Sequence, residues 1–133
     1  MKKLIFIFAL LILVTGCKKD PKPLSSEFDK DKLLEEGKKI ITYIDDGDLD
    51  KIKESGSELF NEVVTDEDLN KAVNLSNEAG EFVEYGPVEV EGFVDFEEKD
   101  MGKVKITAAY SKGIIDYLFL FTKDYKVDSI DLK

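Results

Sequence analysis

The chain has 133 residues, which suits one domain, and its 29 acidic residues outnumber its 19 basic ones to give a net charge of −10. This charge repels nucleic acid phosphates and argues against DNA or RNA binding. There is no His and only one Cys, so the commonest general base and metal ligand is absent and an internal disulfide is excluded. We therefore expect no metal and no cofactor.

The N-terminal segment has the pattern of an export signal. Lys2 and Lys3 form a positive start, and an unbroken apolar run of 11 residues follows over 4–14. A membrane-spanning helix needs about 20 apolar residues, so this shorter run is typical of a signal peptide. The run leads into Val14–Cys17 (VTGC), which resembles the bacterial lipobox.

That resemblance implies that residues 1–16 are a lipoprotein signal peptide and that Cys17 receives lipid and becomes the mature N-terminus. Two acyl chains suffice for stable anchoring, which would place the protein on the extracytoplasmic side of the cell membrane. The alternatives are an ordinary secretory signal with a chance Cys, or an uncleaved membrane anchor. Residues 17–26 are polar and carry prolines that favour an extended backbone, so they predict a flexible tether before a single domain at 27–133.

Amphipathic helices are predicted in the first half of this domain. Apolar residues three and four apart place the first helix at about 27–45. A second helix follows, interrupted at Gly56, and then a third with acidic residues in its first turn. The residues predicted to cap or end these helices are Ser26, Gly47, Asp48, Thr65 and Gly80.

After residue 80 the apolar period changes from 3.6 to 2, which predicts strands. Alternating positions give three strands at about 88–96, 104–110 and 115–121, and a last strand covers 127–132. The links between them are short, which favours antiparallel hairpins. Helices followed by antiparallel strands indicate an α+β fold, with the helices packed on a curved sheet of about four strands whose Val, Ile, Phe and Tyr face points inward.

Three segments carry a resemblance to a known superfamily. They are a helix end and restart at 44–52 (IDDGDLDKI), a helix start at 65–69 (TDEDL) and a closing hairpin at 121–130 (FTKDYKVDSI). Over about 33–132 the chain resembles nuclear-transport-factor-two-like domains, cystatin-like cones of helices and curved sheet. More narrowly, it resembles Gram-positive bacterial lipoproteins that carry such a domain of unknown function. The closing turn often holds Gly in these domains; Tyr125 stands near that place, which predicts a longer turn.

The candidate catalytic and metal-binding groups are carboxylates. Four aspartates surround Gly47, but their spacing is not that of an EF-hand calcium loop, so we interpret them as helix caps. Asp116 is flanked by apolar residues, yet alternation places it opposite Tyr117. We expect no enzymatic activity; the alternative is a cone-fold hydrolase or isomerase using carboxylate acid/base chemistry. The four aspartates are Asp45, Asp46, Asp48 and Asp50.

Aromatic residues are frequent in the strand half of the chain. They either fill the core or line a cavity for a small apolar ligand, and we favour the core. The aromatic residues concerned are Phe82, Tyr85, Phe96, Tyr110, Tyr117, Phe119 and Phe121.

Both faces of the strand at 115–121 are apolar, which is unusual for a one-layer sheet. If Tyr117 and Phe119 face the helices, the residues between them form part of an apolar outer face. We predict that this face contacts a second copy of the chain or another protein partner; the alternative is that the tether or a terminal segment covers it. The candidate interface residues are Phe93, Ala109, Leu118 and Leu120.

Overall fold

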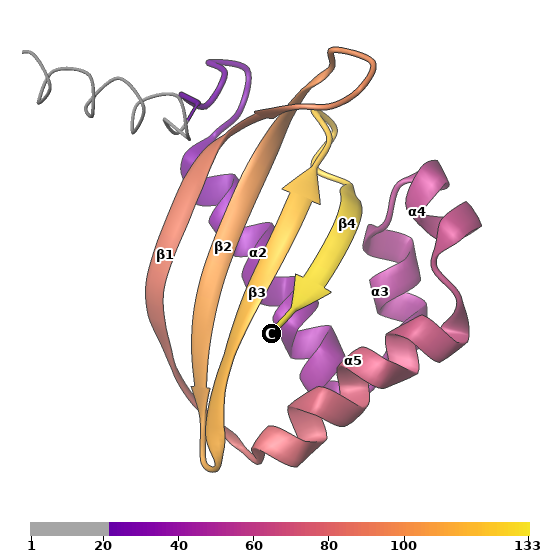
Figure 1. Cartoon of the computed structure of the whole chain (residues 1–133), viewed down its shortest axis with the longest axis vertical. Helices are drawn as coiled ribbons and strands as arrows, with labels where there is room; N and C mark the ends of the chain where they lie inside the picture. The colour runs from indigo at the N-terminus through magenta and orange to yellow at the C-terminus, as the bar shows by residue number, and fades with distance from the viewer. Residues whose placement is uncertain (1–21) are drawn as a thin grey trace, which may run out of the picture.

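Helices precede strands throughout residues 22–133, the part of the chain that the computed structural model describes (Figure 1). The predicted signal peptide and Cys17 lie outside these residues. The α+β prediction is confirmed. The helices are α2 (Lys30–Asp46), α3 (Leu49–Ser55), α4 (Glu58–Val63) and α5 (Asp66–Ala79). The strands are β1 (Phe82–Val94), β2 (Asp100–Tyr110), β3 (Gly113–Phe121) and β4 (Val127–Leu132).

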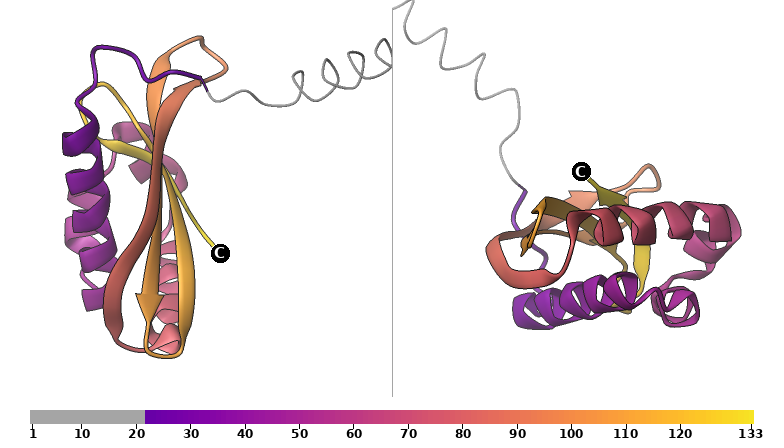
Figure 2. Two further views of the ribbon diagram at one scale, coloured as in Figure 1. Left: turned by 90° about the vertical axis from the view of Figure 1, so that its left-hand side faces the viewer. Right: turned by 90° about the horizontal axis from the view of Figure 1, so that it is seen from below.

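The four strands form one antiparallel sheet in the order β1-β2-β3-β4, so each strand pairs with its neighbour in sequence. In the side view of Figure 2, α2 runs along one face of the bowed sheet, and no helix of the described chain lies against the opposite face. In Figure 1, α3 and α4 lie beyond β4. The sheet therefore has one covered face and one face that is open to solvent.

The core lies between α2 and the covered face of the sheet. The apolar stripe predicted for the first helix is the buried face of α2, and it packs on alternate residues of β2 and β3. This confirms the predicted inward face of the central strands. The buried residues are Leu33, Gly37, Ile40, Ile41 and Ile44 of α2, and Val104, Ile106, Ala108, Tyr110, Ile115, Tyr117, Phe119 and Phe121 of the sheet.

The predicted helix ends are confirmed, with one exception. Gly47 ends α2 in the left-handed conformation (φ +70°), and the carboxylate of Asp48 accepts from the first turn of α3. Thr65 and Asp68 form a reciprocal capping box at the start of α5. The interrupted second helix is two helices, because Ser57 caps α4 immediately after the break. These are local hydrogen bonds, which explains why the sequence predicted them.

The start of α2 differs from the prediction. Asp29, and not Ser26, is the cap, and its side chain accepts from the next backbone amides. Tertiary packing explains the choice: Phe28 is buried, and its ring meets the edge of Tyr125 at 6.0 Å between centroids. The Tyr125 hydroxyl also accepts a hydrogen bond from the Asp29 backbone N–H at 2.8 Å. Tyr125 itself has φ +61°, the conformation that Gly usually supplies in such a turn.

Strand β1 is longer and lies earlier than predicted. It begins at Phe82 and has two register shifts against β2, one between Phe82 and Glu84 and one that spans Gly86 and Pro87. It ends at Val94, so Phe96 lies in the hairpin loop and is fully exposed. The prediction that Phe96 faces the core is therefore wrong.

The segment before α2 is part of the fold from Lys22 onward. Lys22 forms an isolated antiparallel bridge with Gly92 of β1, whose N–H donates to the Lys22 carbonyl at 2.7 Å. Leu24 packs against the core. The tether predicted at 17–26 thus contacts the domain in its second half, on the edge of β1.

Candidate functional site

The open face of the sheet presents rows of side chains that run across the strands. In one row Glu89 faces Lys105 across β1 and β2, and Lys105 in turn faces Leu118. In the next row Glu91, Lys103 and Leu120 follow in the same way. The two cross-strand ion pairs have N–O distances of 3.8 Å and 3.5 Å. Charged residues therefore border the two leucines on the β1 side.

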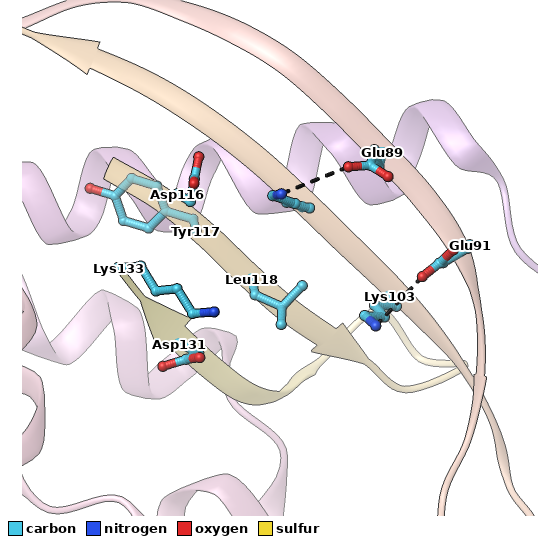
Figure 3. Close-up of a pocket in the computed structure, with 9 residues that line it drawn as sticks. Glu89, Glu91, Lys103, Asp116, Tyr117, Leu118, Asp131 and Lys133 are labelled. Atoms are coloured by element: carbon cyan, nitrogen blue, oxygen red, sulfur yellow. Dashed lines mark ion pairs between the residues drawn. The ribbon is translucent and has the colours of Figure 1, made fainter. Parts of the chain in front are cut away.

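A shallow hollow of about 300 Å³ lies on this face, with Leu118 in its middle (Figure 3). On the β4 side it is bounded by Asp131 and Lys133. Asp116, which alternation placed on this face, is there and accepts a hydrogen bond from the Thr107 hydroxyl at 2.7 Å. The hollow is mostly polar: carboxylates and lysine ammonium groups both line it, and they surround the apolar side chain of Leu118.

The four predicted interface residues do not form one patch. Leu118 and Leu120 lie side by side on β3, both half-buried. Phe93 pairs with Met101 at one end of the sheet, whereas Ala109 pairs with Ile114 of β3 near the other. Met101 and Ala109 are eight steps apart along β2, a distance of about 26 Å.

Two further apolar residues lie on this face and were not predicted from the sequence. Met101, beside Phe93, is almost fully buried, and Ile114, beside Ala109, is 67% exposed. The alternation of β2 and β3 places both on the same side as the leucines. The same period that predicted Leu118 and Leu120 would have identified Ile114, and Met101 was hidden because it was assigned to a turn.

A buried polar cluster, also missed from the sequence, joins α2, α5 and the sheet. The Asp45 carboxylate accepts hydrogen bonds from the Ser76 hydroxyl at 2.6 Å and the Tyr110 hydroxyl at 2.8 Å. The hydroxyls of Tyr110 and Tyr117 are 2.5 Å apart. Because the Tyr110 hydroxyl has one hydrogen and donates it to Asp45, the Tyr117 hydroxyl must be the donor to Tyr110. The chain of donors ends on the carboxylate, which holds three elements together.

Burial dominates the acid–base behaviour of the two tyrosines. It raises the pKa of Tyr110 far above the ordinary value of 10.0, and the hydrogen bond with Tyr117 raises it further. Burial also raises the pKa of Tyr117. Both hydroxyls therefore stay protonated well beyond neutral pH. The cluster is suited to holding the structure together, since each of its polar hydrogens already has an acceptor.

The seven aromatic residues discussed for the core divide into two groups. Tyr110, Tyr117, Phe119 and Phe121 are buried, as the core interpretation predicts, and Tyr85 packs partly against them. Phe82 and Phe96 are exposed. The central strands therefore supply the aromatic core, and β1 contributes little to it.

A second hollow, of about 320 Å³, lies between α4, α5 and β4. Its lining is largely apolar, and Leu75 and Val64 stand at its border, partly exposed. Asp68 and Lys71 supply charged groups there. The apolar side chains lining it are Ile44, Phe60, Val64, Leu69, Ala72, Leu75, Ile130 and Leu132.

The aspartates around Gly47 do not converge on one point. Asp45 points to the buried cluster, and Asp48 caps α3. Within residues 22–133 no group of three or more carboxylates or Cys is arranged to hold a metal ion. Across the same residues, none of the helices has the length and apolar character needed to cross a bilayer.

Comparisons with known proteins support the fold. A solved structure, described as "NMR structure of protein from Ruminococcus gnavus ATCC 29149", is similar with a TM-score of 0.74 and 22% identity, covering 84% of this chain and 96% of that one. A search of the curated proteins found no match. A family model described as "Protein of unknown function (DUF3887)" matches residues 37–130, from the middle of α2 into β4. The chain therefore belongs to the DUF3887 family of proteins of unknown function.

Proposed function

We propose that this protein is a lipid-anchored extracytoplasmic domain that binds a protein partner, in the first instance a second copy of itself, through the open face of its sheet. Anchoring rests on the Val14–Cys17 pattern after a short apolar run. Binding rests on one observation: Leu118 and Leu120 lie together in the middle of a face that no described helix covers. The proposal assigns the domain no catalytic activity.

The surroundings of the two leucines support a specific contact. In a typical protein interface, charged residues are rare at the centre and common at the rim. Here Lys103 and Lys105 are already paired with glutamates, so burying the leucines leaves neither of these two charges without a partner. Full desolvation of an exposed Leu stabilises by about 1.5–3 kcal/mol. Leu118 and Leu120 are already half-buried, so each contributes less, before the costs of association.

The alternative prediction was that the tether or a terminal segment covers the leucine pair. Only the C-terminus lies near it. The described N-terminal segment lies at the edge of β1, where Lys22 pairs with Gly92, and not over β3. At the C-terminus, Lys133 pairs with Asp116 through two backbone hydrogen bonds and stands beside Leu118. The leucine pair is bordered by these residues, but both leucines remain partly exposed.

Sedimentation of residues 22–133 tests the contact surface. We expect the wild type to form dimers at high micromolar concentration and Leu118→Lys to be monomeric. Ile114→Lys is the matched control, because it places the same charge on the same strand and face, outside the leucine pair. If wild type, Leu118→Lys and Ile114→Lys all sediment as monomers, the dimer proposal fails.

Fatty-acid labelling in cells tests the anchor. We expect lipid to be incorporated into the wild type and not into Cys17→Ser. An unmodified Cys17 inside the mature wild-type chain, found by mass spectrometry, would contradict the proposed attachment.

A second function, binding of a small apolar ligand, is favoured by the hollow between α4, α5 and β4. Its volume of about 320 Å³ and its apolar lining fit a small hydrophobic molecule. Ala72→Trp, which would fill the hollow, should abolish binding of a hydrophobic fluorescent dye if this hollow is the site. The arrangement of α2 against a bowed sheet also supports the proposed resemblance to nuclear-transport-factor-two-like domains.

A further inference from the structure

One end of the molecule gathers three chain segments that are far apart in sequence. The segment before α2, the β1–β2 hairpin and the β3–β4 turn all lie at the top in Figure 1. Contacts tie them together: Lys22 pairs with Gly92 of β1, and Lys123 of the turn forms an ion pair with Glu27 at 3.1 Å. The chain therefore enters the domain at the end that carries the β1–β2 hairpin.

Chain length places this end close to any lipid on Cys17. Lys22 is the fifth residue after Cys17, so their Cα atoms are at most about 18 Å apart. Gly92, the partner of Lys22, is four residues from Phe96 at the hairpin tip, a span of at most about 14 Å. The polar layer of one leaflet is about 5–8 Å thick. A lipid on Cys17 thus keeps Phe96 within reach of the bilayer surface.

The hairpin tip presents Phe96 outward on an ordered loop. The Asp95 carboxylate accepts from the backbone N–H groups of Glu97 and Lys99, both at 2.9 Å, and the Asp95 N–H donates to the Lys99 carbonyl. These bonds fix the loop backbone, while the Phe96 ring contacts nothing that shields it from solvent. Phe93 is also partly exposed nearby. Because the Phe96 ring is fully exposed in the free domain, moving it into an apolar environment would remove its whole apolar surface from water, which is favourable.

The charges of the loop select the type of surface. Asp95, Glu97 and Glu98 are acidic, and only Lys99 opposes them, through an ion pair with Glu97 at 3.0 Å. This excess of carboxylates disfavours an anionic bilayer. It is compatible with a zwitterionic bilayer, in which a Phe ring can be buried at the boundary between headgroups and acyl chains.

From this geometry we propose that the tip of the β1–β2 hairpin, led by Phe96, inserts into the surface of the bilayer that carries the chain. The proposal rests on the proposed lipid attachment at Cys17. It sets the orientation of the domain: the hairpin end faces the membrane, and the open face with Leu118 and Leu120 stands roughly upright on it. Partners would then meet the leucine pair sideways, in the plane of the membrane.

The chain's own composition makes the test specific. Cys17 is the single Cys and there is no Trp, so a maleimide phospholipid couples at one place and an introduced Trp reports from one place. The chain from Cys17 to Lys133 is coupled to phosphatidylcholine vesicles that contain lipids brominated on the acyl chains. Phe96→Trp is compared with Ile114→Trp, an exposed position at the start of β3, near the opposite end of the sheet.

We expect Phe96→Trp to lose most of its fluorescence to the brominated lipids and to shift to shorter wavelength, while Ile114→Trp keeps the spectrum that it has in solution. Adding phosphatidylglycerol should weaken the quenching of Phe96→Trp, because of the loop carboxylates. Equal quenching of the two variants, or no quenching in either, would overturn the proposal that the hairpin tip inserts into the bilayer. Because the coupling is chemical, this outcome is independent of whether cells lipidate Cys17, which the Cys17→Ser experiment decides separately.

Discussion

Replacing Asp45 with Ala should destabilise the domain far more than its place near a helix end suggests. Asp45 accepts from the hydroxyls of Ser76 and Tyr110, which are only 2% and 5% exposed. The substitution leaves the hydroxyls of Ser76 and Tyr110 in the interior without their acceptor. Tyr110 cannot simply donate to Tyr117 instead, because the Tyr117 hydroxyl already donates to Tyr110. Three elements lose their shared connection at once.

The magnitude follows from these two bonds. A hydrogen bond to a charged group contributes about 1.5–3 kcal/mol, and a buried donor left unpaired costs a similar amount. Asp45 itself is only half-buried, so water can replace part of what is lost. We expect a loss of about 2–4 kcal/mol from a total stability of about 5–15 kcal/mol. For a domain of this size, that is a fall in Tm of roughly 8–16 °C.

Urea unfolding followed by circular dichroism measures the change, with the slope m expected to stay constant while the midpoint falls. Asp46→Ala is the matched control: it removes the same charge from the next residue of the same helix, where the side chain is exposed. We expect it to change stability by no more than about 0.5 kcal/mol. The reasoning is refuted if the two variants unfold at the same urea concentration, or if Asp45→Ala and Tyr110→Phe are fully additive in the double variant.

Three further predictions follow from the titration and turn geometry. The pKa values of Tyr110 and Tyr117 are raised in the folded domain, so these two hydroxyls ionise at lower pH in the unfolded chain than in the folded one. Their contribution to the free energy of unfolding is therefore complete below pH 10 and falls as the pH rises above it. Absorbance at 295 nm should show that both hydroxyls ionise only when the domain unfolds. The pKa of Asp68 is lowered by its capping hydrogen bonds, so its contribution is present above pH 3.8 and lost as pH falls; Asp68→Asn should unfold with weaker pH dependence in this acid range, and equal dependence would contradict the assignment. Tyr125→Phe removes the acceptor for the Asp29 N–H but keeps the ring, and should cost about 1 kcal/mol in urea unfolding, whereas no loss would show that water replaces the hydroxyl.

The parts of the fold that the sequence predicted are those decided by neighbouring residues. Caps such as Thr65 and Asp48 bond to amides three residues away, so local spacing is sufficient. The start of α2 was misplaced because Ser26 and Asp29 are both good caps. Packing of Phe28 against Tyr125, 97 residues later in the chain, decides between them.

The candidate site was predicted where alternation held and missed where it failed. Leu118 and Leu120 lie on a regular strand, so the period of two placed them correctly on the open face. Phe96 lies in a hairpin loop whose backbone is held by the Asp95 carboxylate, which alternation cannot indicate. The Asp45 cluster joins α2, α5, β2 and β3, and no local pattern relates residues that are brought together only by the folded sheet and helices.

The irregular edge of β1 bears on the solubility of the protein. A 13-residue outer strand with unpaired N–H and C=O groups is normally a template for aggregation. Here Pro87 lacks an N–H, two register shifts disturb the strand, and Lys22 occupies the edge at Gly92. The opposite edge is protected where the Ser57 N–H donates to the Val127 carbonyl of β4 at 2.8 Å. These irregularities, which made the first part of β1 hard to predict from apolar alternation, also hinder the sheets of two copies from pairing edge to edge. Two copies would therefore associate through the faces of their sheets.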